Sequence, residues 1–278
     1  MANSQVSHPD AQAIARELLS AYETGQMVSI PPSDRPGFDL NLAYDVEAAL
    51  KHSRQVAGHR AVGRKVGYAN KAMWRVLKLE TLVWAHMYED TVHYSENNSA
   101  ALAFPRRRSL KIEPEIVFGL KRAINSASLD ATAALESTEW LALGFEIIDC
   151  PFPEWKFQPS DFVASFGLHA ALVIGERTLV QSDMISTLVD QLARFKVRIS
   201  KNGEFVEEGS GRNSLRSPAL CLAELGGAIV RRFPNEPLGS GEIISSGTLT
   251  AGHPTDKGDI WTAEVEGLPL PPLTLRLT

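Results

Sequence analysis

Two stretches decide the fold of this chain: KIEPEIVFGL at residues 111–120 and WLALGFEIIDC at residues 140–150. The first alternates apolar with other side chains between turn-forming residues, and the second is apolar throughout and β-branched near its end. Both patterns predict β-strands, and the apolar character of the second predicts a buried one. These two strands also carry acidic residues, which apolar strands seldom contain.

The acidic residues of the two strands predict a metal site. Glu113 and Glu115 are two positions apart, so their side chains leave the same face of a strand. On a buried face their repulsion would force one of them to take up a proton, unless a divalent cation removed the penalty. The spacing also occurs on solvated strand faces, but Glu146 lies in the second apolar strand, where an unpaired acid is costly. Oxygen ligands favour Mg²⁺, Mn²⁺ or Ca²⁺ over zinc.

The rest of the chain predicts helices at the start and strands through the body. The spacing of apolar residues, the residues that end helices and the turn-forming residues indicate where these elements lie. Helices are expected over residues 9–24, 42–55, 70–78 and 218–232, and further strands over 59–68, 84–94, 162–175, 195–202, 242–249 and 261–265. This order predicts an α+β fold with a mixed or antiparallel sheet.

The chain shows no internal repeat and no linker between two units. We therefore expect residues 1–278 to form a single domain. Within it, residues 1–57 would be a helical N-terminal portion and residues 58–278 a β-rich catalytic body.

The composition is that of a globular protein. The chain has 278 residues, 44% of them apolar and 22% charged, and its formal net charge is −5. A negative protein lacks the field that nucleic-acid partners need. Residues 1–19 show no basic start followed by an apolar run, and no stretch has the apolar length of a membrane helix. We expect a cytoplasmic protein without nucleic-acid or membrane partners.

Four motifs in order carry a resemblance to a known family. They are VGRKVG at residues 62–67, YED at 88–90, IEPEIVFGL at 112–120 and ALGFEIID at 142–149. Together they resemble the fumarylacetoacetate hydrolase superfamily, and most of all its 2-oxopent-4-enoate hydratase and 4-oxalocrotonate decarboxylase group. GSGRNSLRSPALCLAEL at 209–225 and GEIISSGTLTAGHPTDKGD at 241–259 extend the resemblance over nearly the whole chain.

The resemblance implies a fold, a cofactor and an assembly. The fold would be a mixed β-rich roll with helices packed outside, and the protein would be a homo-oligomer. Mg²⁺ or Mn²⁺ would be held by Glu113, Glu115 and Glu146. Lys65 would lie beside the substrate as an acid/base, with a pKa lowered by burial near a cation.

The other candidate residues are also matched through the resemblance. Asp90 corresponds to an acid that would orient or activate water, although it also fits a simple loop carboxylate. His169 would be either a hydrogen-bonded core histidine or an active-site base. Positions expected to support the ligands or the substrate are Asp149, His169, Ser246 and Thr248.

Two segments depart from the pattern of that group. Residues 162–165 read FVAS where the hydratases have an ADNAS-like stretch, and residues 150–155 read CPFPEW where related proteins have Ser-Arg. Both fall near the expected substrate position, so they point to a different substrate preference. Basic residues that could attract a carboxylate substrate are Arg106, Arg107, Arg108, Lys111 and Arg212.

The sequence therefore predicts a metal-dependent lyase of aromatic-compound catabolism. It would hydrate a small 2-hydroxydienoate or 2-oxo acid such as 2-hydroxypenta-2,4-dienoate. A 4-oxalocrotonate-type decarboxylase or an acylpyruvate C–C hydrolase is the first alternative. The second alternative is a non-catalytic relative that serves as a partner subunit, because the group contains enzymes that work in complexes with a pathway enzyme.

Overall fold

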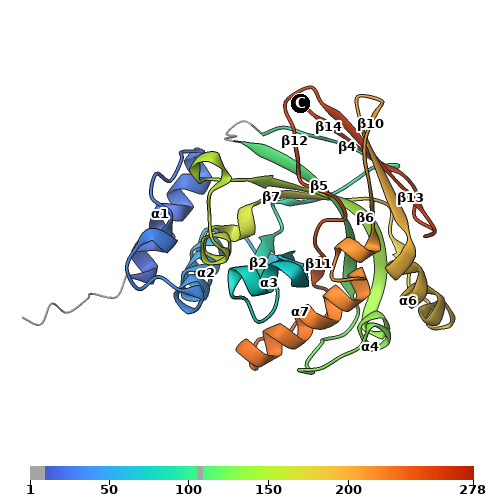
Figure 1. Ribbon diagram of the computed structural model, residues 1–278, viewed down its shortest axis with the longest axis horizontal. Helices are drawn as coiled ribbons and strands as arrows, with labels where there is room; N and C mark the ends of the chain where they lie inside the picture. The colour runs from blue at the N-terminus through green and yellow to red at the C-terminus, as the bar shows by residue number, and fades with distance from the viewer. Residues whose placement is uncertain (1–9, 105–108) are drawn as a thin grey trace, which may run out of the picture.

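The computed structural model describes residues 10–104 and 109–278, and it consists of two β-sheets with helices packed around them (Figure 1). The candidate basic residues Arg106, Arg107 and Arg108 lie outside the described residues.

The larger sheet has nine strands and is mixed. Its main path runs β2 (Val83–Tyr88), β1 (Ala61–Gly67), β11 (Ile243–Ser245), β5 (Leu110–Leu120), β6 (Thr138–Asp149), β7 (His169–Ile174) and β3 (Val92–Tyr94). The short strands β12 (His253–Pro254) and β8 (Thr178–Leu179) pair with β5 and β6. Strands β1 and β11 are parallel, as are β3 and β7, while the long pair β5–β6 is antiparallel. The predicted α+β fold with a mixed sheet is confirmed.

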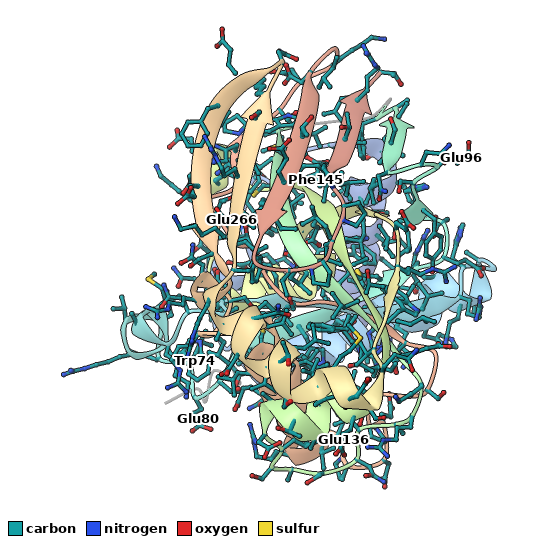
Figure 2. The ribbon with its side chains drawn as sticks, turned by 90° about the vertical axis from the view of Figure 1, so that its right-hand side faces the viewer. Trp74, Glu80, Glu96, Glu136, Phe145 and Glu266 are labelled. Atoms are coloured by element: carbon teal, nitrogen blue, oxygen red, sulfur yellow. The ribbon has the colours of Figure 1, made fainter. Side chains whose placement is uncertain are left out.

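The second sheet has five strands. Its order is β10 (Glu204–Ser210), β9 (Lys196–Lys201), β13 (Ile260–Glu266), β14 (Leu273–Leu277) and β4 (Ser99–Leu102). Figure 2 shows this sheet toward the viewer, with the fully buried Phe145 of β6 lying behind it. The two sheets thus share a core.

Seven α-helices are present in the described residues. Their bounds are α1 (Ala11–Thr24), α2 (Leu40–Val56), α3 (Lys71–Leu77), α4 (Ala131–Glu136), α5 (Pro159–Ala164), α6 (Ile185–Arg194) and α7 (Pro218–Arg232). Helices α1 and α2 lie side by side at one end of the molecule (Figure 1). Within the two described ranges, none of the helices combines the length and apolar character that crossing a membrane requires.

One face of the nine-stranded sheet is turned inward along all its central strands. Strand register places Gly63 and Lys65 of β1 on this face with Ser245 of β11 and Glu115 of β5. One end of the face is closed by an apolar cluster. Its buried members are Met87, Val117, Trp140, Ala142, Leu172, Ile174 and Ile243. The other end of the same face carries the charged residues described below.

Three of the predicted strands are wrong in part. The expected strand over residues 162–175 is a strand only from His169, because its first residues belong to α5 and to the 3-10 helix η3 (Phe166–Leu168). The expected strand over residues 84–94 is divided by a turn at Glu89 and Asp90 into β2 and β3. The one over residues 242–249 keeps only β11 and continues as a loop.

Capping explains why residues 159–164 form a helix instead. Pro159 occupies the first turn, where its missing N–H costs nothing. Asp161 accepts a hydrogen bond from the backbone N–H of Gln158 at 2.8 Å and completes a capping box. The same carboxylate accepts from the N–H of Ser33 at 2.7 Å and from its hydroxyl at 2.5 Å. Apolar content alone could not reveal these contacts.

Replacing Asp161 by Ala should lower the free energy of unfolding by about 3 kcal/mol, because its charged hydrogen bonds with Ser33 and Gln158 are lost together. Chemical denaturation of the variant would measure this. The exposed neighbour Asp34 is a matched control, and Asp34→Ala should change stability by less than about 0.5 kcal/mol. Equal effects of the two substitutions would contradict this explanation of α5.

Candidate active site

Three glutamates converge at the charged end of the inward face. Each of Glu113, Glu115 and Glu146 offers a carboxylate oxygen, and these oxygens lie within 4.8 Å of one another. Glu113 of β5 is the direct cross-strand partner of Glu146 of β6. Like charges in that position destabilise a sheet unless something compensates them. The predicted glutamates are therefore brought together.

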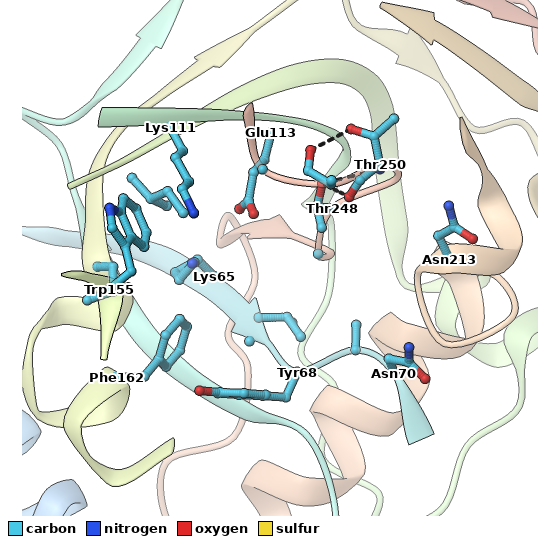
Figure 3. A pocket seen from close by; sticks show the side chains of 18 of the residues that line it. Lys65, Tyr68, Asn70, Lys111, Glu113, Trp155, Phe162, Asn213, Thr248 and Thr250 are labelled. Carbon is cyan, nitrogen blue, oxygen red and sulfur yellow. Dashed lines mark hydrogen bonds between the residues drawn. The ribbon is translucent and has the colours of Figure 1, made fainter. Parts of the chain in front are cut away.

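Glu113 and Lys65 line a cavity of about 550 Å³, and Glu115 and Glu146 lie behind them. Figure 3 shows Lys65 and Glu113 facing the same space, with Lys111 beside Glu113. Aromatic residues line one side of the cavity, namely Tyr68, Trp155, Phe157 and Phe162. Polar residues line the other side, namely Asn70, Glu207, Asn213, Thr248 and Thr250.

Lys65 is held beside the glutamates by two oxygen contacts. Its ammonium nitrogen lies 3.0 Å from Oε2 of Glu146 and donates a hydrogen bond to the carbonyl of Gly167 at 2.9 Å. Gly167 has a φ of 60°, and a side chain there would meet the lysine stem at 2.7 Å. Glycine therefore allows the close approach that fixes the lysine.

Glu146 is fully buried and oriented from both sides. Its Oε1 lies 2.8 Å from Nδ1 of His169, whose Nε2 lies 3.0 Å from Oγ1 of Thr91. The Thr91 hydroxyl already donates to the carbonyl of Tyr88 at 2.9 Å, so its oxygen is an acceptor for the second ring nitrogen. The predicted His169 thus contacts a site carboxylate and does not line the cavity.

Glu115 is positioned by β11 and the loop after it. Its Oε2 accepts from the hydroxyl of Ser245 at 2.5 Å and from the backbone N–H of Gly247 at 2.8 Å. Across the cluster, Gly252 lies so close to Glu113 that a Cβ would stand 2.9 Å from Oε1. The segment after β11 therefore encloses both glutamates of β5.

The pKa values of the three carboxyl groups are driven apart. Burial is the main cause that raises the pKa of Glu113 to about 7, with Lys65 opposing the rise and Glu146 adding to it. Burial and the two neighbouring carboxylates raise the pKa of Glu115 well above its usual range. Burial also works against ionisation of Glu146, but Lys65 and His169 outweigh it and lower its pKa. Two of the three groups thus bind protons more readily than ordinary glutamates when no cation balances them.

This donor set fits a divalent cation. Three carboxylates with no sulfur or imidazole ligand form the kind of site that Mg²⁺, Mn²⁺ or Ca²⁺ prefers. Oε2 of Glu146 is buried and, among the described residues, accepts no hydrogen bond of good geometry beyond its contact with Lys65. A cation would satisfy that oxygen and replace the protons on the other two glutamates.

The pKa of Lys65 is raised when no cation is present, whereas the sequence predicted a lowered pKa beside a bound cation. Burial would lower it, as expected from the sequence, but Glu146, Glu113 and Glu115 together raise it above the usual value. The prediction considered the cation and burial, whereas three carboxylates surround the ammonium. A bound divalent ion would offset much of their effect.

Other predicted residues lie away from the cavity. Asp90, in the turn after β2, binds Arg54 through both of its oxygens at 2.6 and 2.7 Å and does not line the cavity. Asp149, at the end of β6, accepts from the N–H of Ser109 at 3.2 Å and does not line it either. The structure thus brings neither acid to the three glutamates.

The two hydroxyl residues predicted after β11 differ in position. Thr248 lines the cavity, and its hydroxyl donates to the carbonyl of Thr250 at 2.9 Å. Ser246 is buried and donates to the carbonyl of Ile116 at 2.7 Å, so its hydroxyl supports β5 rather than the cavity.

Several residues of the site were not predicted. Ser245, Gly247 and Thr91 contact the site residues through the fold. Ser245 and Gly247 lie in the 241–259 stretch that carries the resemblance, but their contacts with Glu115 depend on the pairing of β11 with β5. Trp155 and Phe162 line the cavity, and for these a signal existed. They lie in the two segments that depart from the hydratase pattern.

Known relatives match this chain along most of its length. A 2-hydroxyhexa-2,4-dienoate hydratase from Comamonas testosteroni is 26% identical over 253 residues, which cover 91% of this chain and 92% of the relative. A 4-oxalocrotonate decarboxylase from Pseudomonas sp. strain CF600 is 25% identical over 266 residues, 96% of this chain and 97% of the relative. The resemblance predicted from the sequence is confirmed. No family model matches the chain.

Solved structures share the fold. 4-Oxalocrotonate decarboxylase from Pseudomonas putida G7, complexed with magnesium and adipate, superposes with a TM-score of 0.85 at 22% identity and covers 100% of this chain and 99% of its own. Fumarylpyruvate hydrolase from Pseudomonas aeruginosa, in complex with Mn²⁺ and pyruvate, has a TM-score of 0.56 at 16% identity, covering 78% of this chain and 89% of its own. The predicted roll of the fumarylacetoacetate hydrolase type is therefore correct.

The metal-free protein should lose stability as pH rises from about 4.5 to about 7. Glu113 has a folded pKa near 7 against an ordinary 4.5, so the folded state binds more protons in that window and unfolding becomes easier as they leave. Mg²⁺ at about 100 times its Kd should restore about 2.7 kcal/mol. Thermal melts from pH 5 to 8, with EDTA or with Mg²⁺, would test this. Melts that do not respond to Mg²⁺ at pH 8 would contradict a cation site.

Proposed function

We propose that this chain is a divalent-metal-dependent hydratase that acts on a small 2-hydroxydienoate and its 2-oxo tautomer. One observation carries the proposal: the Lys65 ammonium and a cluster of three carboxylates meet at a cavity, which Lys65 and Glu113 line. Buried ionisable groups of opposite sign at a cavity mark functional sites.

The relatives support the type of reaction. Both the hydratases and the decarboxylase among them are enzymes, and several bear the name 2-keto-4-pentenoate hydratase, such as one from Burkholderia vietnamiensis that is 23% identical over 92% of this chain. The proposal extends to Mg²⁺ or Mn²⁺ as the ion, and to a homo-oligomeric protein of the cytoplasm. These finer points rest on the resemblance.

A divalent ion held by Glu113, Glu115 and Glu146 would bind the carboxylate and C2 oxygen of a 2-oxo acid and act as a Lewis acid toward them. Lys65 lines the same cavity, with its ammonium anchored to Glu146 and Gly167. In this position it can donate a proton to the substrate or accept one from it. We assign no catalytic role to Asp90, because Arg54 binds both of its carboxylate oxygens.

The proposed reaction needs two proton transfers. In the first, the 2-hydroxyl loses a proton and C5 gains one, which converts the dienol into a 2-oxo acid with a C3–C4 double bond. In the second, water loses a proton as its oxygen bonds to C4, and C3 gains a proton, giving a 4-hydroxy-2-oxo acid. Lys65 would move the protons nearest to C2 and C3.

Two alternatives remain distinct from this proposal. A decarboxylase of the 4-oxalocrotonate type, or an acylpyruvate hydrolase, would use the same cation and lysine, and the decarboxylase relative covers nearly all of this chain. A non-catalytic partner subunit would have no need of a buried lysine and three buried or half-buried glutamates, so the cluster weighs against it.

Proton NMR of the protein with Mg²⁺ and a mixture of 2-hydroxypenta-2,4-dienoate, 4-oxalocrotonate and an acylpyruvate would test the proposal. We expect EDTA-sensitive consumption of the dienoate and formation of a 4-hydroxy-2-oxo acid. Release of CO₂ would identify the decarboxylase, and two organic fragments the hydrolase. No consumption of any component, with Mg²⁺ bound, would overturn an enzymatic role on these acids.

Glu146→Gln should lower Mg²⁺ affinity and reduce turnover by more than about a hundredfold, because even residues that only orient metal ligands cost tenfold to a hundredfold. Isothermal titration with Mg²⁺ and the NMR assay would measure both effects. The exposed Glu139, on the same strand β6, provides the control, and Glu139→Gln should leave both unchanged. Full turnover in Glu146→Gln at saturating Mg²⁺ would refute the ligand assignment.

Lys65→Met should retain Mg²⁺ binding and lose about 100-fold to 10,000-fold in turnover, which is the usual contribution of a positioned acid/base. The same titration and assay apply. If Mg²⁺ binding disappears together with turnover, Lys65 holds the glutamates in place and the proton-transfer role is wrong.

A further inference from the structure

The cavity has a continuous aromatic wall that begins at the charged floor. The ring of Phe162 lies 4.6 Å from the Lys65 ammonium, and Tyr68 meets Phe162 edge to face at 5.6 Å. On the same side of the cavity, the Lys111 ammonium lies 3.9 Å from the centre of the Trp155 ring. Figure 3 shows Phe162 and Trp155 on the same side of the cavity, with Lys65 between them and Glu113. Any group that leaves the floor on this side meets apolar rings.

The wall is held rigidly in place. Phe162 is carried by the capped helix α5 and packs so closely over Gly67 that a Cβ there would stand 2.4 Å from its ring. Glu154 and Trp155 both have positive φ angles, 54° and 58°, a costly conformation for two successive residues with side chains. The indole N–H of Trp155 donates to the Ser109 hydroxyl at 2.9 Å. Strained backbone that presents a half-buried indole to a cavity is consistent with ligand contact.

Few basic side chains line the cavity. Of the described residues that line it, only Lys65 and Lys111 are basic. Lys65 already contacts Glu146, and the ammonium of Lys111 lies over the Trp155 ring. Glu207 also lines the cavity and contacts His253 at 2.6 Å. Among the described lining residues, a second carboxylate would therefore find no basic side chain that is free of such a contact.

The cavity is also larger than a five-carbon acid requires. Such an acid has about eight heavy atoms, whereas cavities of several hundred Å³ hold drug-sized ligands. The cavity has a volume of about 550 Å³. The space beyond the floor lies along the aromatic wall.

We propose that the substrate is a monocarboxylic 2-oxo acid longer than five carbons, whose uncharged hydrocarbon chain lies on the wall formed by Phe162 and Trp155. These two residues would determine specificity. The proposal rests on the proposed function, because it places the C1 and C2 oxygens at the glutamate floor. The proposal gives a substrate-binding role to one residue in each of the two segments, 150–155 and 162–165, that depart from the hydratase pattern.

Binding of saturated 2-oxo acids in the presence of Mg²⁺ tests the proposal without turnover. Isothermal titration would compare 2-oxobutanoate, 2-oxopentanoate, 2-oxohexanoate, 2-oxoheptanoate and the dicarboxylate 2-oxohexanedioate. Each added methylene should lower Kd about fourfold, which corresponds to about 0.8 kcal/mol of buried CH₂. The dicarboxylate should bind about tenfold more weakly than 2-oxohexanoate, because its second carboxylate would lose water without gaining a partner.

Replacing the aromatic residues of the wall should reduce the dependence of Kd on chain length. Trp155→Ala and Phe162→Ala should reduce the gain per methylene to less than about twofold while 2-oxobutanoate still binds. Trp155 is half-buried, so its variant remains informative if the more deeply buried Phe162→Ala fails to fold. Tyr94, an aromatic residue that is 52% exposed and does not line the cavity, is the control, and Tyr94→Ala should keep the full series.

The outcomes separate this proposal from the proposed function. If no 2-oxo acid binds in a Mg²⁺-dependent way, the proposed function fails. If 2-oxobutanoate binds but Kd does not change with chain length, the hydrocarbon wall is refuted while the function stands. Tighter binding of 2-oxohexanedioate than of 2-oxohexanoate, abolished by Lys111→Met, would refute the monocarboxylic assignment and make Lys111 the partner of a second carboxylate.

Discussion

The cross-strand pairing of Glu113 with Glu146 is the constraint on which the rest of the site depends. Two carboxylates directly opposite each other inside a sheet repel, and burial removes the water that would otherwise screen them. Lys65 and His169 contact Glu146 and offset the repulsion there, while Glu113 and Glu115 have pKa values shifted upward. The fold accepts this cost toward one end of its longest strand pair, where the three carboxylates could hold a divalent cation.

The local part of this arrangement could be predicted from sequence. Glu113 and Glu115 share a face because strand side chains alternate, and an apolar strand makes Glu146 conspicuous. That Lys65 reaches Glu146 could not follow from spacing, because the contact joins β1 to β6 through a long-range sheet order. Only the resemblance brought the lysine to the site, and spacing could not show that three carboxylates together raise its pKa when no cation is bound.

The residues that line the cavity were harder to predict for a different reason. The apolar run that includes Phe162 reads equally well as a strand or a helix, and the decision came from Pro159 and from the contact of Asp161 with Ser33. The position of Trp155 depends on a left-handed backbone conformation, which tryptophan seldom adopts. Asp90 fitted a motif, but its partner Arg54 lies on a helix whose packing the motif does not describe.

The apolar cluster that includes Met87, Trp140 and Ile174 fills the inward face at the end away from the three glutamates. Substrate and product would therefore occupy the same cavity, beside Lys65 and Glu113. Accumulated product would compete with substrate for this space and would behave as a competitive inhibitor.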